Sequence, residues 1–140
     1  MLNNDSNRMA IKGALLKYCR QLGIIALPKL VFKPEDFYRY DNRYTIEYLR
    51  RCVGTASLKK NVILVNLDYR GNVKRWRYWS ESVALCSISS KWNLREATRT
   101  LVHELLHLRF YNLRHGYFYE RRINEILEGR KFEIQNRDQN

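Results

Sequence analysis

The sequence has few histidines and few cysteines, and each shortage narrows what the chain can be. It contains three histidines in 140 residues, so a histidine-based site has to use most of them. The three cysteines, Cys19, Cys52 and Cys86, are far apart, odd in number and form no C-x-x-C pair. This pattern argues against a cysteine-ligated zinc module. It predicts free, mostly buried thiols, as in proteins of a reducing compartment.

Long apolar runs are also missing from the sequence. No segment approaches the roughly 20 apolar residues that a membrane-spanning helix needs. The stretch MLNNDSNRMAIKG lacks the charged and apolar regions of a signal peptide. We therefore expect a cytoplasmic protein with no membrane partner. There are no repeats or linkers, and with 45% hydrophobic and 13% aromatic residues we expect a single folded domain over residues 1–140.

Acidic residues are few relative to basic ones. The chain has 26 Lys and Arg against 14 Asp and Glu, which gives a formal net charge of +12 and a pI near 9.9. A positive field of this size attracts polyanions, so DNA or RNA is a candidate partner, although charge that serves solubility alone explains the same composition.

One basic stretch also carries aromatic rings, and its candidate nucleic-acid-binding residues are Lys74, Arg75, Trp76 and Arg77. Rings that stack on bases beside cations that meet phosphates form a platform for single strands. The alternative is a strand with a period of two, in which Trp76 and Tyr78 face the core while Arg75 and Arg77 face water. The sequence leaves both interpretations open.

The spacing of apolar residues predicts an α+β fold with an N-terminal helix, a small mixed or antiparallel sheet and two C-terminal helices. The run VILV at 62–65 is β-branched and continuous, as in a strand buried on both faces. Residues 35–50 fit either a strand or a helical turn. The segment 68–92 suggests a hairpin or loop around Gly71–Asn72 and a further strand in the run SVALCSIS. The other expected elements are a helix over 5–22 with Asp5 or Ser6 as its cap, an extended segment over 29–33 and a strand within 52–59. A helix capped by Asn93 should follow, with a break near 112–116 and a last helix within 116–132.

The sequence around residue 103 contains the motif H-E-x-x-H, formed by His103, Glu104 and His107. On a helix, His107 lies only about 40° around the axis from His103, so both imidazoles leave one face and can meet one ion. Leucines at 101, 105 and 108 lie on the opposite side and provide an apolar face for the core. Glu104 flanks the histidines, where a carboxylate can act as a general base on a water. The motif predicts a catalytic zinc site, although H-E-x-x-H also occurs by chance in buried helices.

The third metal ligand is less certain from the residues alone. His115 follows His107 by eight residues, and Gly116 permits a left-handed conformation that would end the helix and reverse the chain. Glu120 and Glu125 are the acidic alternatives on the next predicted helix. Glu125 lies among arginines, where an ion pair is the simpler role. His115 is the preferred ligand, because histidine is the commonest zinc partner.

The stretch VHELLHLRFYNLRHGYFYERRINEIL resembles the catalytic region of SprT-like zinc metalloproteases, and is similar to YgjP-like metal-dependent peptidases. In those families a helical H-E-x-x-H is followed by a turn that carries a third histidine. A small residue comes directly after that histidine, and an aromatic residue comes four positions after the same histidine. Here His115, Gly116 and Tyr119 occupy these places. The resemblance implies that His103, His107 and His115 bind one Zn²⁺ and that Glu104 is the base.

The upstream stretch CVGTASLKKNVILVNL is similar to the strands that precede the active helix in SprT-like domains, whereas the long 68–92 segment departs from the pattern. The expected activity is hydrolysis of peptide bonds in proteins or peptides, including proteins associated with nucleic acid. An edge strand beside the active helix can bind substrate by adding a strand, and Val62, Ile63, Leu64 and Val65, or the strand before them, are the candidates. The alternatives are a YgjP-like or regulator-cleaving peptidase with no nucleic-acid role, and a nucleic-acid-binding module with a structural zinc.

Overall fold

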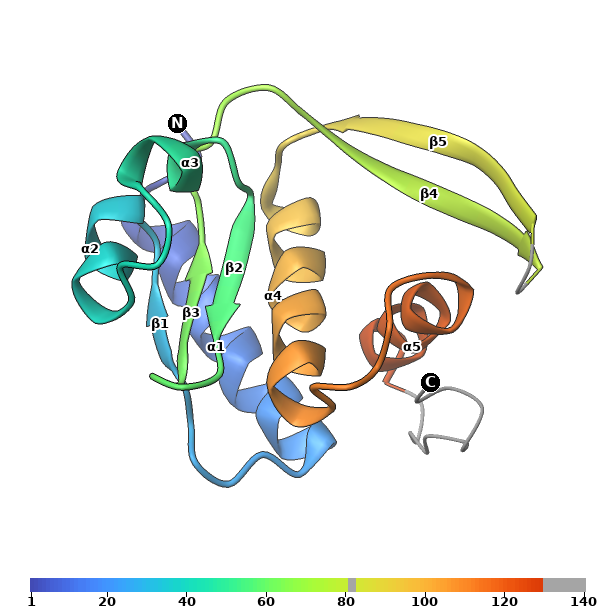
Figure 1. Ribbon diagram of the computed structural model, residues 1–140, viewed down its shortest axis with the longest axis horizontal. Coiled ribbons are helices and arrows are strands. Elements are labelled where there is room, and N and C mark those ends of the chain that lie inside the picture. Colours follow the sequence, from blue (N-terminus) through green and yellow to red (C-terminus); the bar gives the residue numbers. More distant parts are fainter. Residues whose placement is uncertain (81–82, 130–140) are drawn as a thin grey trace.

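The computed structural model describes residues 1–80 and 83–129 and has the predicted α+β architecture (Figure 1). The strands form two sheets, one of three strands and one of two. The strands lie in the sequence between the N-terminal helix and the last two helices. The elements in chain order are α1 (Asp5–Leu22), β1 (Lys29–Val31), α2 (Pro34–Tyr40), α3 (Ile46–Arg50), β2 (Gly54–Ser57), β3 (Val62–Val65), β4 (Asn72–Ser80), β5 (Val83–Lys91), α4 (Leu94–Arg109) and α5 (Tyr117–Leu127).

The three-stranded sheet has the order β1-β3-β2, with β1 parallel and β2 antiparallel to the central β3. All four side chains of β3 are completely buried. Ile63 and Val65 belong to the main core with α1 and α4, whereas Val62 and Leu64 belong to a second core cluster with α2 and α3. Helices therefore cover both faces of this sheet (Figure 1), which confirms the prediction made from the VILV run.

Helix α1 has the bounds that the sequence predicts, and Gly23 ends it in the left-handed conformation with φ of 70°. Its cap differs from the prediction, because Asn4 rather than Asp5 or Ser6 accepts a hydrogen bond from a backbone amide of the first turn. The ambiguous residues 35–50 form two short helices. Pro34 is the first residue of α2, a position that suits proline because the missing N–H has no helical partner there.

Strands β4 and β5 form a long two-stranded hairpin, here called the arm, that extends away from the three-stranded sheet and over α5 (Figure 1). Of the two alternatives for Gly71–Asn72, the loop is confirmed and the hairpin is wrong, because the chain from 66 to 71 is a loop and Asn72 already pairs with Lys91 at the start of β4. The expected strand SVALCSIS is confirmed from Val83 onward, where it belongs to β5. The residues that join the two strands, 81 and 82, lie outside the described part of the chain, as do the side chains of 79–86, including Cys86.

Helix α4 lies against the three-stranded sheet and carries the H-E-x-x-H motif. Its N-cap is Asn93, as predicted, whose side chain accepts a hydrogen bond from the backbone N–H of Glu96 at 2.9 Å. Just before it, the Trp92 indole donates to the carbonyl of Asn66 after β3, at 3.0 Å. These contacts fix the start of α4 relative to the central strand. In the part of the chain that the structure describes, no helix is both long and apolar enough to cross a membrane.

Candidate metal centre

The three histidines meet at one point, although only two of them come from the same helix. His103 and His107 lie one turn apart on α4, and His115 approaches them from the segment between α4 and α5. The Nε2 atoms of His103 and His107 are 3.1 Å apart, and those of His107 and His115 are 2.9 Å apart. The structure therefore brings together all three histidines that the sequence identifies, and this group could hold a metal ion.

The convergence of three imidazole nitrogens suits metal coordination better than mutual hydrogen bonding. Three neutral imidazoles whose Nε2 atoms converge cannot all satisfy one another, because each ring has one donor and one acceptor nitrogen. Ligands about 2.0–2.1 Å from a tetrahedral ion are about 3.4 Å from one another, slightly wider than the two distances found here. A shared ion would accept all three lone pairs with a small outward movement of the rings.

A short turn and a glycine position the third histidine. Helix α4 ends at Arg109, close to the predicted break, and α5 begins after Gly116. Gly116 has φ of 142° and ψ of −156°, a conformation that residues with a side chain rarely adopt. The prediction that it ends the first helix in the left-handed region is wrong, because it is instead the N-cap of the second. Its role in turning the chain behind His115 is the one expected.

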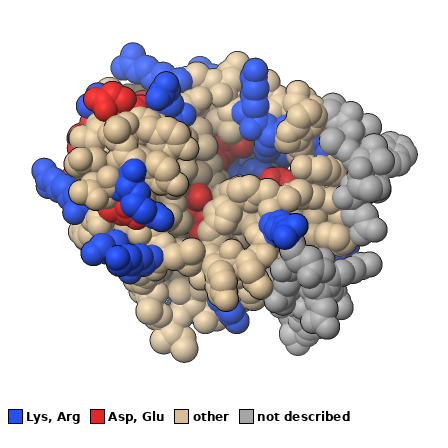
Figure 2. Space-filling model, in the orientation of Figure 1, with Lys and Arg blue, Asp and Glu red and all other residues tan. Residues whose placement is uncertain are grey.

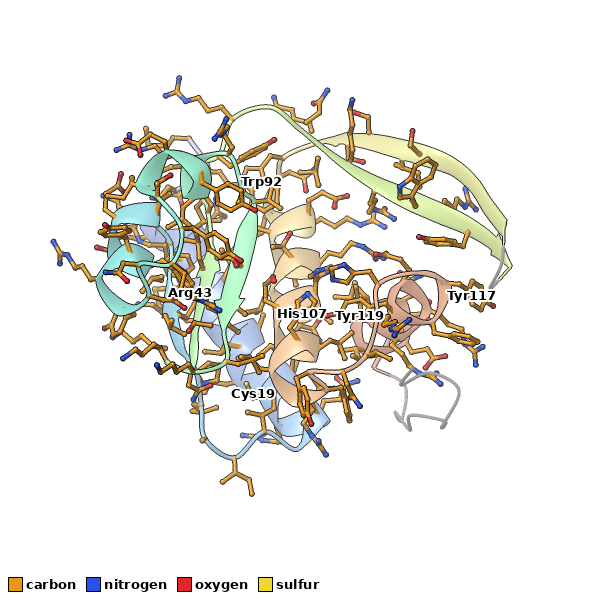
Figure 3. The ribbon with its side chains drawn as sticks, in the orientation of Figure 1. Cys19, Arg43, Trp92, His107, Tyr117 and Tyr119 are labelled. Atoms are coloured by element: carbon orange, nitrogen blue, oxygen red, sulfur yellow. The ribbon has the colours of Figure 1, made fainter. Side chains whose placement is uncertain are left out.

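Tyr119 packs against all three histidine rings. Its side chain is completely buried, and its ring centroid lies 4.9 Å from those of His103 and His115 and 5.2 Å from that of His107. Figure 3 shows Tyr119 on α5 pointing toward His107 on α4. The Tyr119 hydroxyl donates to the backbone carbonyl of His103 at 2.6 Å, which ties α5 to α4 at the centre.

Burial keeps the two helical histidines neutral. Desolvation, with a further contribution from the neighbouring imidazoles, lowers the pKa of His103 to about 3 and that of His107 to about 4. Neutral imidazole is the form that coordinates a metal, so both rings are ready to bind at neutral pH without first losing a proton.

Glu104 lies beside the histidines and is almost completely buried. Desolvation raises the pKa of its carboxyl group to about 8 in the metal-free protein. Gly54 at the start of β2 lies next to it: a β-carbon on Gly54 would lie 3.7 Å from Glu104, an ordinary contact, but only 2.5 Å from the Thr100 side chain and 2.8 Å from the Leu64 carbonyl. Because residue 54 has no side chain, strand β2 can approach α4 closely beside Glu104.

A groove of ≈ 510 Å³ runs over the cluster. Its sides come from the edge of β2, the arm, α4 and the start of α5, and its floor includes the three histidines and Glu104. Figure 2 shows a hollow near the middle of this face, with acidic and basic side chains inside it. The candidate centre is therefore open to a molecule larger than water.

The acidic alternatives to His115 have other partners. Glu120 accepts a hydrogen bond from Arg99 at 2.5 Å. Glu125 pairs with Arg121 at 3.2 Å and with Arg122 at 2.7 Å, as its neighbours in the sequence suggested. Neither carboxylate belongs to the histidine group found among the described residues.

The substrate strand expected at Val62–Val65 requires a correction. These residues form β3, whose two edges are already paired with β1 and β2, so its backbone groups have no free edge to offer. The strand before it, β2, pairs with β3 along one edge, and its other edge is unpaired within residues 1–80 and 83–129. Val53, Gly54 and Thr55 line the groove beside the histidines, so the second candidate from the sequence is the one with the right position.

The arm also differs from the expected alternation of buried rings and exposed cations. Trp76 is 55% exposed, whereas the Arg75 side chain is only 30% exposed and lies 3.9 Å from the carboxylate of Glu96 on α4. Lys74 and Arg77 are exposed. The four candidate nucleic-acid-binding residues therefore do not form one surface, since alternate residues of a strand point to opposite sides.

Sequence reasoning missed two residues of the site. Gly54 interrupts a β-rich run, a position where glycine often marks a close backbone approach, so a signal was present. Arg99 connects α4 to α5 through Glu120 and Asn124, at 2.5 and 2.7 Å, and only the packing of the two helices reveals it.

Comparisons of the chain with protein-family models, with curated proteins and with solved structures gave no match. The chemistry of the centre is therefore inferred from the residues and geometry described above.

Proposed function

We propose that the protein is a zinc-dependent endopeptidase. One observation carries this proposal: three imidazole nitrogens converge beside a buried carboxylate, on the floor of a groove bordered by an unpaired strand edge. The donor set of three histidines is typical of catalytic zinc, which keeps one position open, whereas structural zinc sites are closed by four protein ligands. The resemblance of residues 102–127 to SprT-like metalloproteases agrees with this chemistry.

The chain's own residues account for the other parts of the reaction. A zinc ion held by His103, His107 and His115 would lower the pKa of a water to about 7 and polarise the scissile carbonyl. Glu104 receives the proton of the attacking water and returns it to the leaving amine. The free edge of β2 binds the peptide backbone as an added strand and holds the scissile bond over the histidines.

Glu104→Gln tests the mechanism directly. We expect about one zinc per chain in both wild type and variant, and cleavage of an unfolded protein substrate by the wild type alone. The exposed Glu47 provides a matched control, since Glu47→Gln removes the same charge on α3, away from the centre. Equal cleavage by wild type and Glu104→Gln would exclude the proposed role of Glu104.

His115→Ala tests the ligand set. Removal of one of three ligands should lower zinc affinity at least tenfold, while Glu120→Gln and Glu125→Gln should leave it nearly unchanged. The measurement is a competition titration with a chromophoric chelator. Unchanged affinity in His115→Ala would move the third ligand to one of the two glutamates.

A second candidate function, contact with single-stranded nucleic acid, is favoured by the exposure of Trp76 and Lys74 on the arm. An exposed ring beside an exposed cation can stack on a base and meet a phosphate. Binding of a labelled single-stranded oligonucleotide should weaken as salt rises, and Trp76→Ala should reduce it. Binding that changes neither with salt concentration nor in Trp76→Ala would contradict this proposal.

A further inference from the structure

The inner face of β4 carries arginines where a packed strand would carry apolar residues. Val73, Arg75 and Arg77 alternate along β4 and therefore share one face. Val73, at the base, packs against the main core, and Arg75 turns toward Glu96 on α4, so this face points to the body of the protein. The outer half of the arm thus presents guanidinium groups, rather than a hydrophobic surface, to the helices beneath it.

A hollow of ≈ 370 Å³, here called the under-arm hollow, lies between these arginines and α5. It shares Arg75, Arg99 and Glu120 with the lining of the groove over the histidines, so the two spaces adjoin. Trp76 and Tyr78 of β4 also border both spaces, and Tyr117 of α5 borders the hollow alone. A side chain that branches from a peptide in the groove can therefore enter a space with cationic and aromatic walls.

The arginines around the under-arm hollow are not equally neutralised. Arg99 pairs with Glu120 at 2.5 Å, and Arg121 pairs with Glu125 at 3.2 Å. In contrast, the buried Nε of Arg75 has no hydrogen-bond partner within residues 1–80 and 83–129, and its distance of 3.9 Å from Glu96 is too long for such a bond. None of the ion pairs found in the same part of the chain involves Arg77.

A buried guanidinium N–H without an acceptor destabilises the folded protein, because it has lost its hydrogen bond to water and forms none within the protein. Rotation of the Arg75 side chain toward an incoming carboxylate would remove that destabilising effect, because a carboxylate can accept hydrogen bonds from a guanidinium in a bidentate manner. The aromatic walls would pack against the methylene groups that connect such a carboxylate to the peptide backbone.

We propose that the under-arm hollow is a specificity subsite for an acidic side chain, Asp or Glu, of a substrate residue near the scissile bond. Arg75 and Arg77 bind the carboxylate, and the substrates are acidic segments of proteins. This inference rests on the proposed peptidase function, and it adds the substrate class to it. The net charge of +12 acts in the same direction, since it attracts acidic chains before they reach the groove.

The test uses the zinc-loaded full chain and peptides built around a cleavage site mapped in an unfolded protein. Each residue near the scissile bond is replaced in turn by Glu, Gln or Lys, three side chains of similar length. We expect kcat/KM to be at least about tenfold higher for Glu than for Gln at one position, and lowest for Lys. The variant Arg75→Gln/Arg77→Gln should bring the Glu:Gln ratio toward one. The matched control, Arg20→Gln/Arg39→Gln, removes two exposed arginines of α1 and α2 and should keep the ratio.

Two further measurements separate the possible outcomes. If the double variant does not fold, Arg77→Glu alone, at an exposed position, should shift the preference from Glu toward Lys. The zinc-loaded Glu104→Gln protein, which cannot cleave, should bind a labelled Glu peptide at least about tenfold more tightly than the Gln peptide in fluorescence anisotropy. Cleavage that depends on Glu104 but shows no acidic preference would overturn the subsite alone. No Glu104-dependent cleavage of any substrate would overturn both the subsite and the peptidase function.

Discussion

The strands β3 and β4 show how differently one chain can use a strand. Every side chain of β3 is completely buried between two helical layers, and its backbone is paired on both sides. In the described part of the chain β4 pairs with β5 alone, and its middle residues include an exposed tryptophan and two arginines. The first strand supports the helix that carries Glu104, whereas the second forms one side of the groove. Stability and selectivity are therefore expected to reside in separate parts of the molecule.

A change in β3 should have the largest effect on folding. Ile63→Ala removes a completely buried side chain from the main core and should lower the free energy of unfolding by about 2–5 kcal/mol. Ile25→Ala, at a position that is 96% exposed, is the control and should change it by less than about 0.5 kcal/mol. Chemical denaturation measures both. Similar losses in the two variants would contradict the assignment of stability to the buried strand.

The pH dependence of stability should reveal Glu104 in the metal-free protein. Its pKa is raised to about 8, so the folded state retains a proton that the unfolded state loses from about pH 4.5 upward. Stability from this group is complete below that pH and is lost as pH rises toward 8. The wild type should thus lose up to about 3 kcal/mol relative to Glu104→Gln between pH 5 and 8.

The same titration tests the histidines at lower pH. His103 and His107 have lowered pKa values in the folded state, so the unfolded state binds more protons below about pH 6.5. The metal-free protein should therefore lose stability as pH decreases toward 4.

For the Glu104 prediction, Glu47→Gln is again the control for Glu104→Gln. A difference between wild type and Glu104→Gln that does not vary between pH 5 and 8 would contradict the burial of Glu104.

Substitution of two glycines should change the stability of the protein by intermediate amounts. Gly54→Ala would place a β-carbon 2.5 Å from the Thr100 side chain and 2.8 Å from the Leu64 carbonyl, and should cost about 1–3 kcal/mol. Gly13→Ala, in the interior of α1 with open space around it, should instead stabilise the protein by about 0.5–1 kcal/mol. Thermal unfolding of both variants gives the sign of each change. A neutral Gly54→Ala would show that β2 and α4 are less closely packed than described.

The smallest effect is expected on the arm. Trp76→Ala removes a large ring, but the ring is 55% exposed and should contribute less than about 0.5 kcal/mol to folding. The measurement is the same chemical denaturation as for Ile63→Ala. A loss above about 2 kcal/mol would mean that the arm belongs to the core, and would end the contrast between the two strands.

Local sequence patterns predicted the parts of the molecule whose structure depends on neighbours in the chain. The helical period gave the bounds of α1, the β-branched run gave the buried β3, and the spacing of His103 and His107 gave two rings on one face of α4. The same patterns gave an ambiguous result at 44–48, where Tyr44 and Tyr48 alternate as in a strand. Their rings stack at 4.9 Å beside the start of α3 instead.

Patterns of this kind could not predict features that depend on distant contacts. Gly71–Asn72 has the composition of a hairpin turn, but the pairing of β4 with β5 over nine residues each outweighs that local preference. The inward orientation of Arg75 depends on Glu96, which belongs to another element. The position of His115 likewise required a turn, a glycine with positive φ and the packing of Tyr119 under three rings.

The hydrogen bond from Tyr119 to the carbonyl of His103 joins the same two helices that the proposed metal ion would join. Two of the histidines belong to α4 and the third precedes α5. If the proposed zinc binds there, metal occupancy and the docking of α5 would be linked equilibria, and free zinc would stabilise the docked state by mass action. Amide hydrogen exchange along Tyr117–Leu127 should then slow as the zinc concentration rises.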